Sequence, residues 1–110
     1  MNPSQVPSLA AHEVPQDAYL LDVREDDEWA AGHAEGAKHI PMGEVVTRLE
    51  ELPNDGLVHV ICRAGGRSAR VTAYLNSNGW DAINVDGGMQ LWQAAGRPLV
   101  GESGAEPTVI

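Results

Sequence analysis

The chain has 110 residues, of which 43% are hydrophobic, and it carries a formal net charge of −9. This length suits one compact domain with a single core, and the negative charge argues against nucleic acid or an anionic membrane as a partner. A lone cysteine excludes an internal disulfide, a CxxC redox pair and a cysteine-rich zinc site.

Short apolar runs alternate with helix-like segments along the chain. The expected elements are a short strand near Val6, a small helix over 9–14, a strand over 19–23, a helix from Asp26 to Gly32, an extended piece at 39–40, a helix over 45–52, a strand over 57–61, a helix over 67–78, a strand over 82–85 and a helix over 89–96. This alternation predicts an α/β fold with a mostly parallel sheet covered on both faces.

Several details of these elements are testable. The helix over 45–52 is predicted to present one apolar stripe, made of Val45, Val46, Leu49 and Leu52. Asp86 is expected to cap the last helix, and Met89 and Trp92, three residues apart in that helix, to pack in the core. Residues 1–100 are expected to form the domain, and residues 101–110, which mix Gly, Glu, Ser and Pro, to form a flexible tail.

The most informative feature is the place of the cysteine. Cys62 ends the apolar run 57–61 and is followed by a short loop with two glycines and then by a helix. In a parallel sheet, ligands bind at the carboxyl ends of strands, beside helix N-termini. Backbone N–H groups of such a loop can point at the sulfur and favour the thiolate, which is the nucleophilic form.

Charge is unevenly spread around this loop. Residues 56–80 contain Arg63, Arg67 and Arg70 but no aspartate or glutamate, although the chain as a whole is acidic. Cations are disfavoured at a helix N-terminus unless an anion is present, so the arginines favour an anion-binding loop over a merely solvated basic stretch. The alternative for Cys62 itself is a buried, inert thiol.

The chain resembles the rhodanese-like domains, which are single-domain sulfurtransferases, over about residues 5–100. Three motifs carry the resemblance: Leu21-Asp22-Val23-Arg24-Glu25 running into Glu28-Trp29, Gly32-His33, Gly36-Ala37 and Ile40-Pro41; the loop Cys62-Arg63-Ala64-Gly65-Gly66-Arg67-Ser68; and Gly87-Gly88-Met89 with Trp92 and Ala95-Gly96-Arg97-Pro98. Ala34 departs from the pattern, which usually has a larger aliphatic residue there.

The resemblance implies a three-layer α/β/α fold with a five-stranded, mainly parallel sheet. It also implies a thiosulfate sulfurtransferase-like enzyme in which Cys62 takes a sulfur atom from a small anionic donor such as thiosulfate. The resulting persulfide passes that sulfur to cyanide, a thiol or a protein acceptor. The expected persulfide-binding residues are Arg63, Ala64, Gly65, Gly66, Arg67 and Ser68, with Gly65 and Gly66 providing backbone angles that other residues avoid.

Other readings of the loop are weaker. A Cys-x5-Arg phosphatase needs arginine where this chain has Ser68, and commonly has histidine where it has Ile61. Mercaptopyruvate-type loops carry few charges, whereas Arg63 and Arg67 resemble the thiosulfate type. The alternative function is a persulfide carrier or a protein-binding regulatory module with little turnover of small molecules.

The remaining polar residues are expected to be structural. Asp22 and Arg24 are predicted to brace neighbouring loops, and His33 to be a hydrogen-bonded turn residue. His12 and His39 show no ligand spacing, so neither a metal nor another cofactor is expected. The N-terminus lacks the features of a signal peptide and no apolar run approaches transmembrane length, which predicts a cytoplasmic protein.

Overall fold

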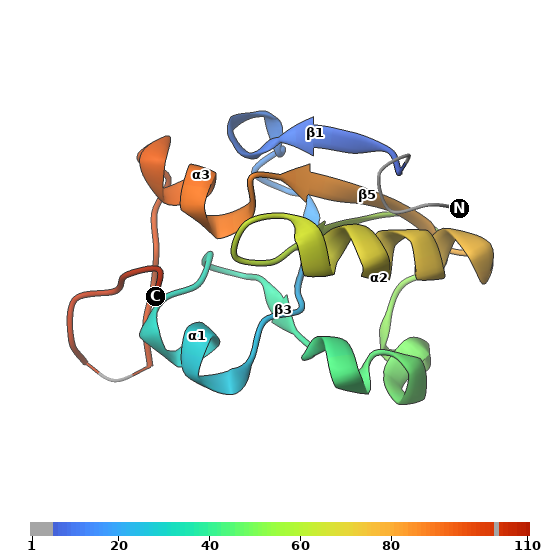
Figure 1. The fold of residues 1–110 in the computed structure, drawn as a ribbon, viewed down its shortest axis with the longest axis horizontal. Helices are drawn as coiled ribbons and strands as arrows, with labels where there is room; N and C mark the ends of the chain where they lie inside the picture. The colour runs from blue at the N-terminus through green and yellow to red at the C-terminus, as the bar shows by residue number, and fades with distance from the viewer. Residues whose placement is uncertain (1–5, 103) are drawn as a thin grey trace.

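Figure 1 shows the fold in a computed structural model, which describes residues 6–102 and 104–110. In chain order the elements are β1 (Ser8–Ala10), the 3-10 turn η2 (Ala11–Glu13), β2 (Tyr19–Asp22), α1 (Asp26–Ala31), β3 (Lys38–His39), the 3-10 helices η3 (Met42–Glu44) and η4 (Val46–Glu51), β4 (Leu57–Ile61), α2 (Gly66–Ser77), β5 (Asp81–Asp86) and α3 (Gly88–Ala94). The predicted order of strands and helices is confirmed. Within the described residues, no helix is long and apolar enough to cross a membrane.

The five strands form one sheet in the order β1-β5-β4-β2-β3, and each pairing is parallel. In the central strand β4, Val60 pairs with Leu21 of β2 and with Asn84 of β5. The predicted α/β class and five-stranded sheet are confirmed, and the sheet is parallel throughout. Its carboxyl edge therefore gathers α1, α3 and the start of α2 (Figure 1).

Alternating strand residues fill two cores, one on each face of the sheet. On one face Leu21, Val58 and Val60 pack with Val71 and Leu75 of α2. The opposite face has its own cluster, which includes Leu20, Ala34, Ile61, Val85, Met89 and Trp92. The prediction that Met89 and Trp92 belong to the core is confirmed. Both faces of the sheet are thus covered, and the loops that follow the strands lie at its carboxyl edge.

The stretch after Pro41 departs from the predicted helix. It forms two 3-10 segments, with non-helical angles at Arg48 (φ −124°, ψ 22°). Val45 and Leu52 are buried as predicted, but Val46 is 59% exposed, so its place in the apolar stripe was wrong. The run of β-branched residues 45–47 disfavours an α-helix, and the tighter 3-10 turn changes which side chains share a face.

The C-terminal segment 104–110 lies beside α1. The Thr108 N–H donates to the Ala31 carbonyl at 2.9 Å, and Val109 packs against the second core. A Cβ on Gly32 would lie 2.4 Å from the Thr108 carbonyl oxygen, so glycine permits this close approach. The flexibility expected for residues 101–110, and the domain boundary at residue 100, stay predictions.

Candidate active site

Cys62 lies at the carboxyl edge of the sheet, directly after β4. Cys62 is 2% exposed, and the loop that follows it leads into the first turn of α2. The sulfur accepts a hydrogen bond of 3.0 Å from the Gly65 N–H and one of 3.2 Å from the Ser68 hydroxyl. The predicted loop residues Gly65 and Ser68 thus meet at the sulfur.

These donors decide the ionisation of the thiol. Burial raises the pKa of Cys62, but hydrogen bonds from the Ser68 hydroxyl and from the N–H groups of Ser68, Gly65 and Ala64 outweigh it and lower the pKa overall. The groups that lower the pKa most are therefore uncharged dipoles, as expected for the backbone N–H groups of this loop. The thiolate is favoured without being bound in an ion pair.

The two loop glycines have different roles. Gly65 precedes α2 in the left-handed region (φ 110°), which orients its N–H toward the sulfur, and a Cβ there would lie 3.3 Å from the Gly87 nitrogen. Gly66 has no positive φ, and a Cβ there would meet nothing within 4 Å. The expectation that Gly66 supplies an unusual backbone angle was wrong.

The start of α3, which follows the Gly87-Gly88 pair, packs against the backbone of the cysteine loop. The N–H of Met89 donates to the Cys62 carbonyl at 2.8 Å, and that of Gln90 to the Arg63 carbonyl at 3.0 Å. A Cβ on Gly88 (φ 56°) would lie 2.3 Å from the Cys62 carbonyl oxygen, so only glycine fits. Gly87 precedes α3 and no side chain caps the helix, so the capping role predicted for Asp86 was wrong.

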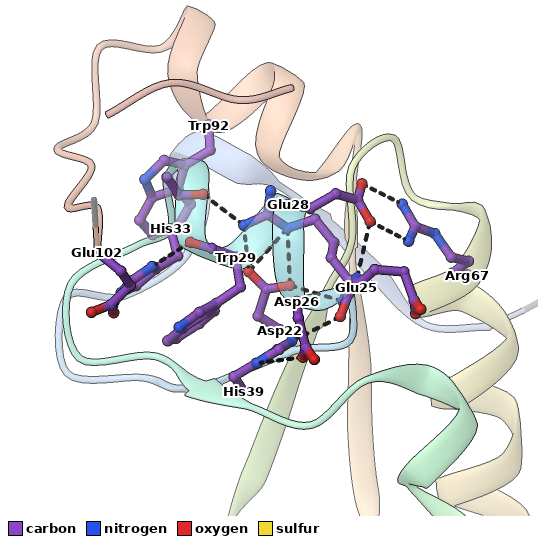
Figure 2. A network of polar contacts seen from close by, with 12 residues as sticks. Asp22, Glu25, Asp26, Glu28, Trp29, His33, His39, Arg67, Trp92 and Glu102 are labelled. Carbon is purple, nitrogen blue, oxygen red and sulfur yellow. Dashed lines mark hydrogen bonds and ion pairs between the residues drawn. The ribbon is translucent and has the colours of Figure 1, made fainter. Parts of the chain in front are cut away.

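The arginines of the basic stretch have different environments. Arg63 is exposed, and its Nε donates to the Ile110 carbonyl at 3.0 Å; with the Gln90 amide turned so that its oxygen accepts, Nη1 and Nη2 each donate to it at 3.2 Å. Arg67 donates through Nη1 and Nη2 to both carboxylate oxygens of Glu28, at 2.7 and 2.9 Å. Figure 2 shows this ion pair at the start of α2. The sequence reading missed Glu28 as a site residue.

Asp22 and Arg24 form a fully buried pair beneath α1. The Arg24 guanidinium donates to both Asp22 oxygens, the shortest contact being 2.8 Å, and Nη2 also donates to the Gly32 carbonyl at 2.7 Å. The Arg24 N–H adds a bond of 3.0 Å to Asp22 Oδ1. The pair thereby ties the end of β2, where Asp22 lies, to Gly32, the residue that follows α1.

Histidines stack on both sides of Trp29 next to this pair. The His33 ring lies 3.5 Å from the Trp29 ring and the His39 ring 4.7 Å, both nearly parallel to it. His33 Nδ1 bonds the Trp29 carbonyl and His39 Nε2 the Arg24 carbonyl, each at 2.8 Å. His33 is therefore hydrogen-bonded, as predicted, but it lies in an isolated antiparallel bridge with Val100 and not in a turn.

Two cavities lie away from the cysteine loop. One of about 710 Å³ is lined by the segment before β2, by Trp92 and by Arg97, and by no residue of the 62–68 loop. A smaller one of about 140 Å³ is lined by apolar residues and Arg70. The donors and short contacts described above define the site at Cys62.

Comparison with known proteins identifies this arrangement. The model of the rhodanese-like domain matches residues 5–95. The chain belongs to the rhodanese-like domain family. It is 42% identical over 86 residues to the Bacillus subtilis (strain 168) protein YtwF, covering 78% of this chain and 84% of YtwF. It is also 36% identical over 78 residues to the thiosulfate sulfurtransferase GlpE of Pseudomonas putida (strain KT2440), covering 70% of this chain and 71% of GlpE.

Solved structures agree with the sequence comparison. The crystal structure of a rhodanese-like domain protein from Staphylococcus aureus superposes with a TM-score of 0.75 at 33% identity, covering 93% of this chain and 98% of that one. The chain is therefore a single rhodanese-like domain related to sulfurtransferases.

Proposed function

We propose that this rhodanese-like protein is a thiosulfate sulfurtransferase-like enzyme that carries sulfur on Cys62. It moves a sulfane sulfur atom from a donor such as thiosulfate to a nucleophilic acceptor, either cyanide or a thiol. The observation that supports this most is the pair of donors on the sulfur, the Gly65 N–H at 3.0 Å and the Ser68 hydroxyl at 3.2 Å. Both favour an anionic sulfur, which the nucleophile and the persulfide share.

The reaction has two steps that balance without an external oxidant. In the first, the Cys62 thiolate attacks the outer sulfur of thiosulfate; a new S–S bond forms, the donor S–S bond breaks, and sulfite leaves with the electron pair. In the second, the acceptor attacks the outer sulfur of the persulfide and Cys62 leaves as the thiolate. With cyanide as acceptor the product is thiocyanate.

The loop residues and the buried Asp22–Arg24 pair have different roles in the proposed reaction. The N–H groups of Ala64, Gly65 and Ser68, with the Ser68 hydroxyl, hold the negative charge of the thiolate and then of the persulfide. Arg63, exposed at the rim, attracts the anionic donor. Asp22 and Arg24 act at a distance, by holding the end of β2 beside the loop.

The alternative is a persulfide carrier or a regulatory module with little turnover on small molecules. Cys62 with its full set of donors argues against an inactive regulatory domain, but a carrier that delivers sulfur to a protein thiol uses the same loop. We propose a cytoplasmic location, because an unpaired reactive thiol persists in a reducing compartment.

The test is steady-state thiocyanate formation from thiosulfate and cyanide by the wild-type protein and by Cys62→Ser. We expect turnover in the wild type and none in the variant, with unchanged far-UV circular dichroism. Full turnover by Cys62→Ser would refute the mechanism. Negligible wild-type turnover together with rapid sulfur transfer to a protein thiol would favour the carrier.

A further inference from the structure

The charge of Arg67 is compensated within the site. Both of its terminal nitrogens bind Glu28, at 2.7 and 2.9 Å, and the pair is largely sheltered, with side chains 30% and 13% exposed respectively. The hydrogen bonds from Arg67 lower the pKa of Glu28 to about 2. Glu28 is therefore an anion at every pH near neutrality.

This ion pair is close to the reacting sulfur. Arg67 directly precedes Ser68, whose hydroxyl is 3.2 Å from Cys62 Sγ. The pKa of Arg67 is raised mainly by its hydrogen bonds to Glu28, and the charge of Cys62 contributes further. Arg67 and Cys62 thus lie within electrostatic reach of each other, so the carboxylate on Arg67 also acts on an anion approaching the sulfur.

The start of α1 holds the Glu28 carboxylate in place. The Glu25 N–H donates to Glu28 Oε1 at 3.0 Å, which fixes the carboxylate opposite Arg67. Figure 2 shows Glu25 and Glu28 on the side of Arg67. A dianion that reaches Cys62 from this side meets an arginine already paired with a carboxylate instead of a free cation.

We propose that Glu28 is a specificity-determining residue, which neutralises Arg67 and so favours sulfur donors with one negative charge over donors with two. This inference rests on the proposed sulfur transfer through Cys62. It ranks monoanionic carriers of sulfane sulfur above dianionic ones such as thiosulfate, which remain donors. The second negative charge of thiosulfate then slows its reaction with Cys62, relative to a donor of the same sulfur chemistry with one charge.

Two donors that differ in charge but not in reaction test this directly. Thiosulfate has two negative charges and methanethiosulfonate has one. In both, the Cys62 thiolate bonds to the outer sulfur, the donor S–S bond breaks, and the electron pair leaves with sulfite or with methanesulfinate. The ratio of their rates of persulfide formation isolates the effect of the extra charge.

The variant is Glu28→Gln, which preserves shape and removes the charge that compensates Arg67. We expect the thiosulfate-to-methanethiosulfonate ratio to rise about threefold to tenfold, and the rise to shrink at high ionic strength. The matched control is Asp27→Asn, which removes the same charge from an exposed side chain with no arginine partner in the described part of the chain. Its ratio should stay within about twofold of wild type.

A second pair of reagents separates this inference from the proposed function. Iodoacetate and iodoacetamide alkylate the same thiolate and differ by one charge, so their rate ratio reports the potential at Cys62 without sulfur transfer. Glu28→Gln should raise this ratio as well. Because both reagents reach the same sulfur, a change in access or in the folded fraction cancels.

The outcomes are distinct. Unchanged ratios in both assays, or a fall in the thiosulfate ratio, would overturn the role of Glu28 even if Cys62 forms a persulfide. A raised alkylation ratio with no persulfide from either donor would overturn the proposed function and the donor preference with it. If Glu28→Gln fails to fold, Arg67→Gln serves instead: it leaves Glu28 uncompensated, so both ratios should fall below wild type, and a rise would contradict the inference.

Discussion

Two anions in this protein are stabilised in different ways. The Cys62 sulfur accepts hydrogen bonds from uncharged groups, the Gly65 N–H and the Ser68 hydroxyl, at the edge of the sheet. The Asp22 carboxylate, at the end of the neighbouring strand β2, is bound by the fully buried Arg24 guanidinium. Dipoles stabilise charge while leaving the sulfur unpaired for attack, whereas a guanidinium makes the carboxylate a fixed structural link.

The largest effect is expected at the structural anion. Asp22→Asn leaves the Arg24 charge buried opposite a neutral amide, which should lower the free energy of unfolding by about 3–5 kcal/mol. Urea denaturation measures this, with the exposed Asp27→Asn as a control expected to cost less than about 1 kcal/mol. A loss at Asp22 no larger than the control would mean that the pair is not a structural link.

Gly88→Ala tests the close contact between the start of α3 and the cysteine loop. The new Cβ would lie 2.3 Å from the Cys62 carbonyl oxygen at a positive φ, so we expect a loss of about 2–4 kcal/mol together with reduced reactivity of Cys62. Gly36→Ala is the matched control, since its φ is also positive (81°) but its Cβ meets nothing within 4 Å. It should cost about 1 kcal/mol and leave Cys62 unaffected. Equal effects of the two variants would show that the contact with Cys62 is unimportant.

Ser68→Ala removes one dipole from the reactive anion. The pKa of Cys62 should rise, because the Ser68 hydroxyl is the strongest of the groups that lower it. Loss of one hydrogen bond to a charged group predicts about tenfold slower alkylation at neutral pH. Ser77→Ala, an exposed position at the end of the same helix, is the control. A Ser68→Ala protein that titrates and reacts like wild type would show that the hydroxyl does not stabilise the thiolate.

The smallest effect is a dependence of stability on pH. The pKa of Cys62 is lower in the folded protein than in the unfolded chain, so the folded state gains stability as pH rises from the folded pKa toward the unfolded value of about 8.5. The gain is lost as pH falls through the folded pKa. The difference in unfolding free energy between wild type and Cys62→Ser should therefore grow in favour of wild type as pH rises. A constant or shrinking difference would contradict the lowered pKa.

Much of this arrangement could be predicted from local sequence. The apolar run 57–61 followed by Cys62 and glycines located the thiol at the carboxyl edge of a parallel sheet, because strand direction and loop position follow from the βαβ pattern. Gly65 and Ser68 lie within six residues of Cys62, so their meeting at the sulfur follows from one tight turn into a helix.

The parts that could not be predicted depend on contacts between distant segments. Glu28 and Arg67 are 39 positions apart, and the sequence shows neither their distance nor that one neutralises the other. The close contact between Gly88 and the Cys62 carbonyl depends on how α3 lies against the cysteine loop, which the sequence alone does not show. Val46 was misassigned because the 45–52 stretch has the spacing of an α-helix but turns as a 3-10 helix.

The most direct test of the account is the intact mass of the protein after incubation with thiosulfate and removal of excess donor. We predict a gain of one sulfur atom in the wild type, its loss on addition of cyanide, and no gain in Cys62→Ser. An unchanged wild-type mass with thiosulfate and with methanethiosulfonate, or an equal gain in Cys62→Ser, would contradict the claim that Cys62 carries the transferred sulfur.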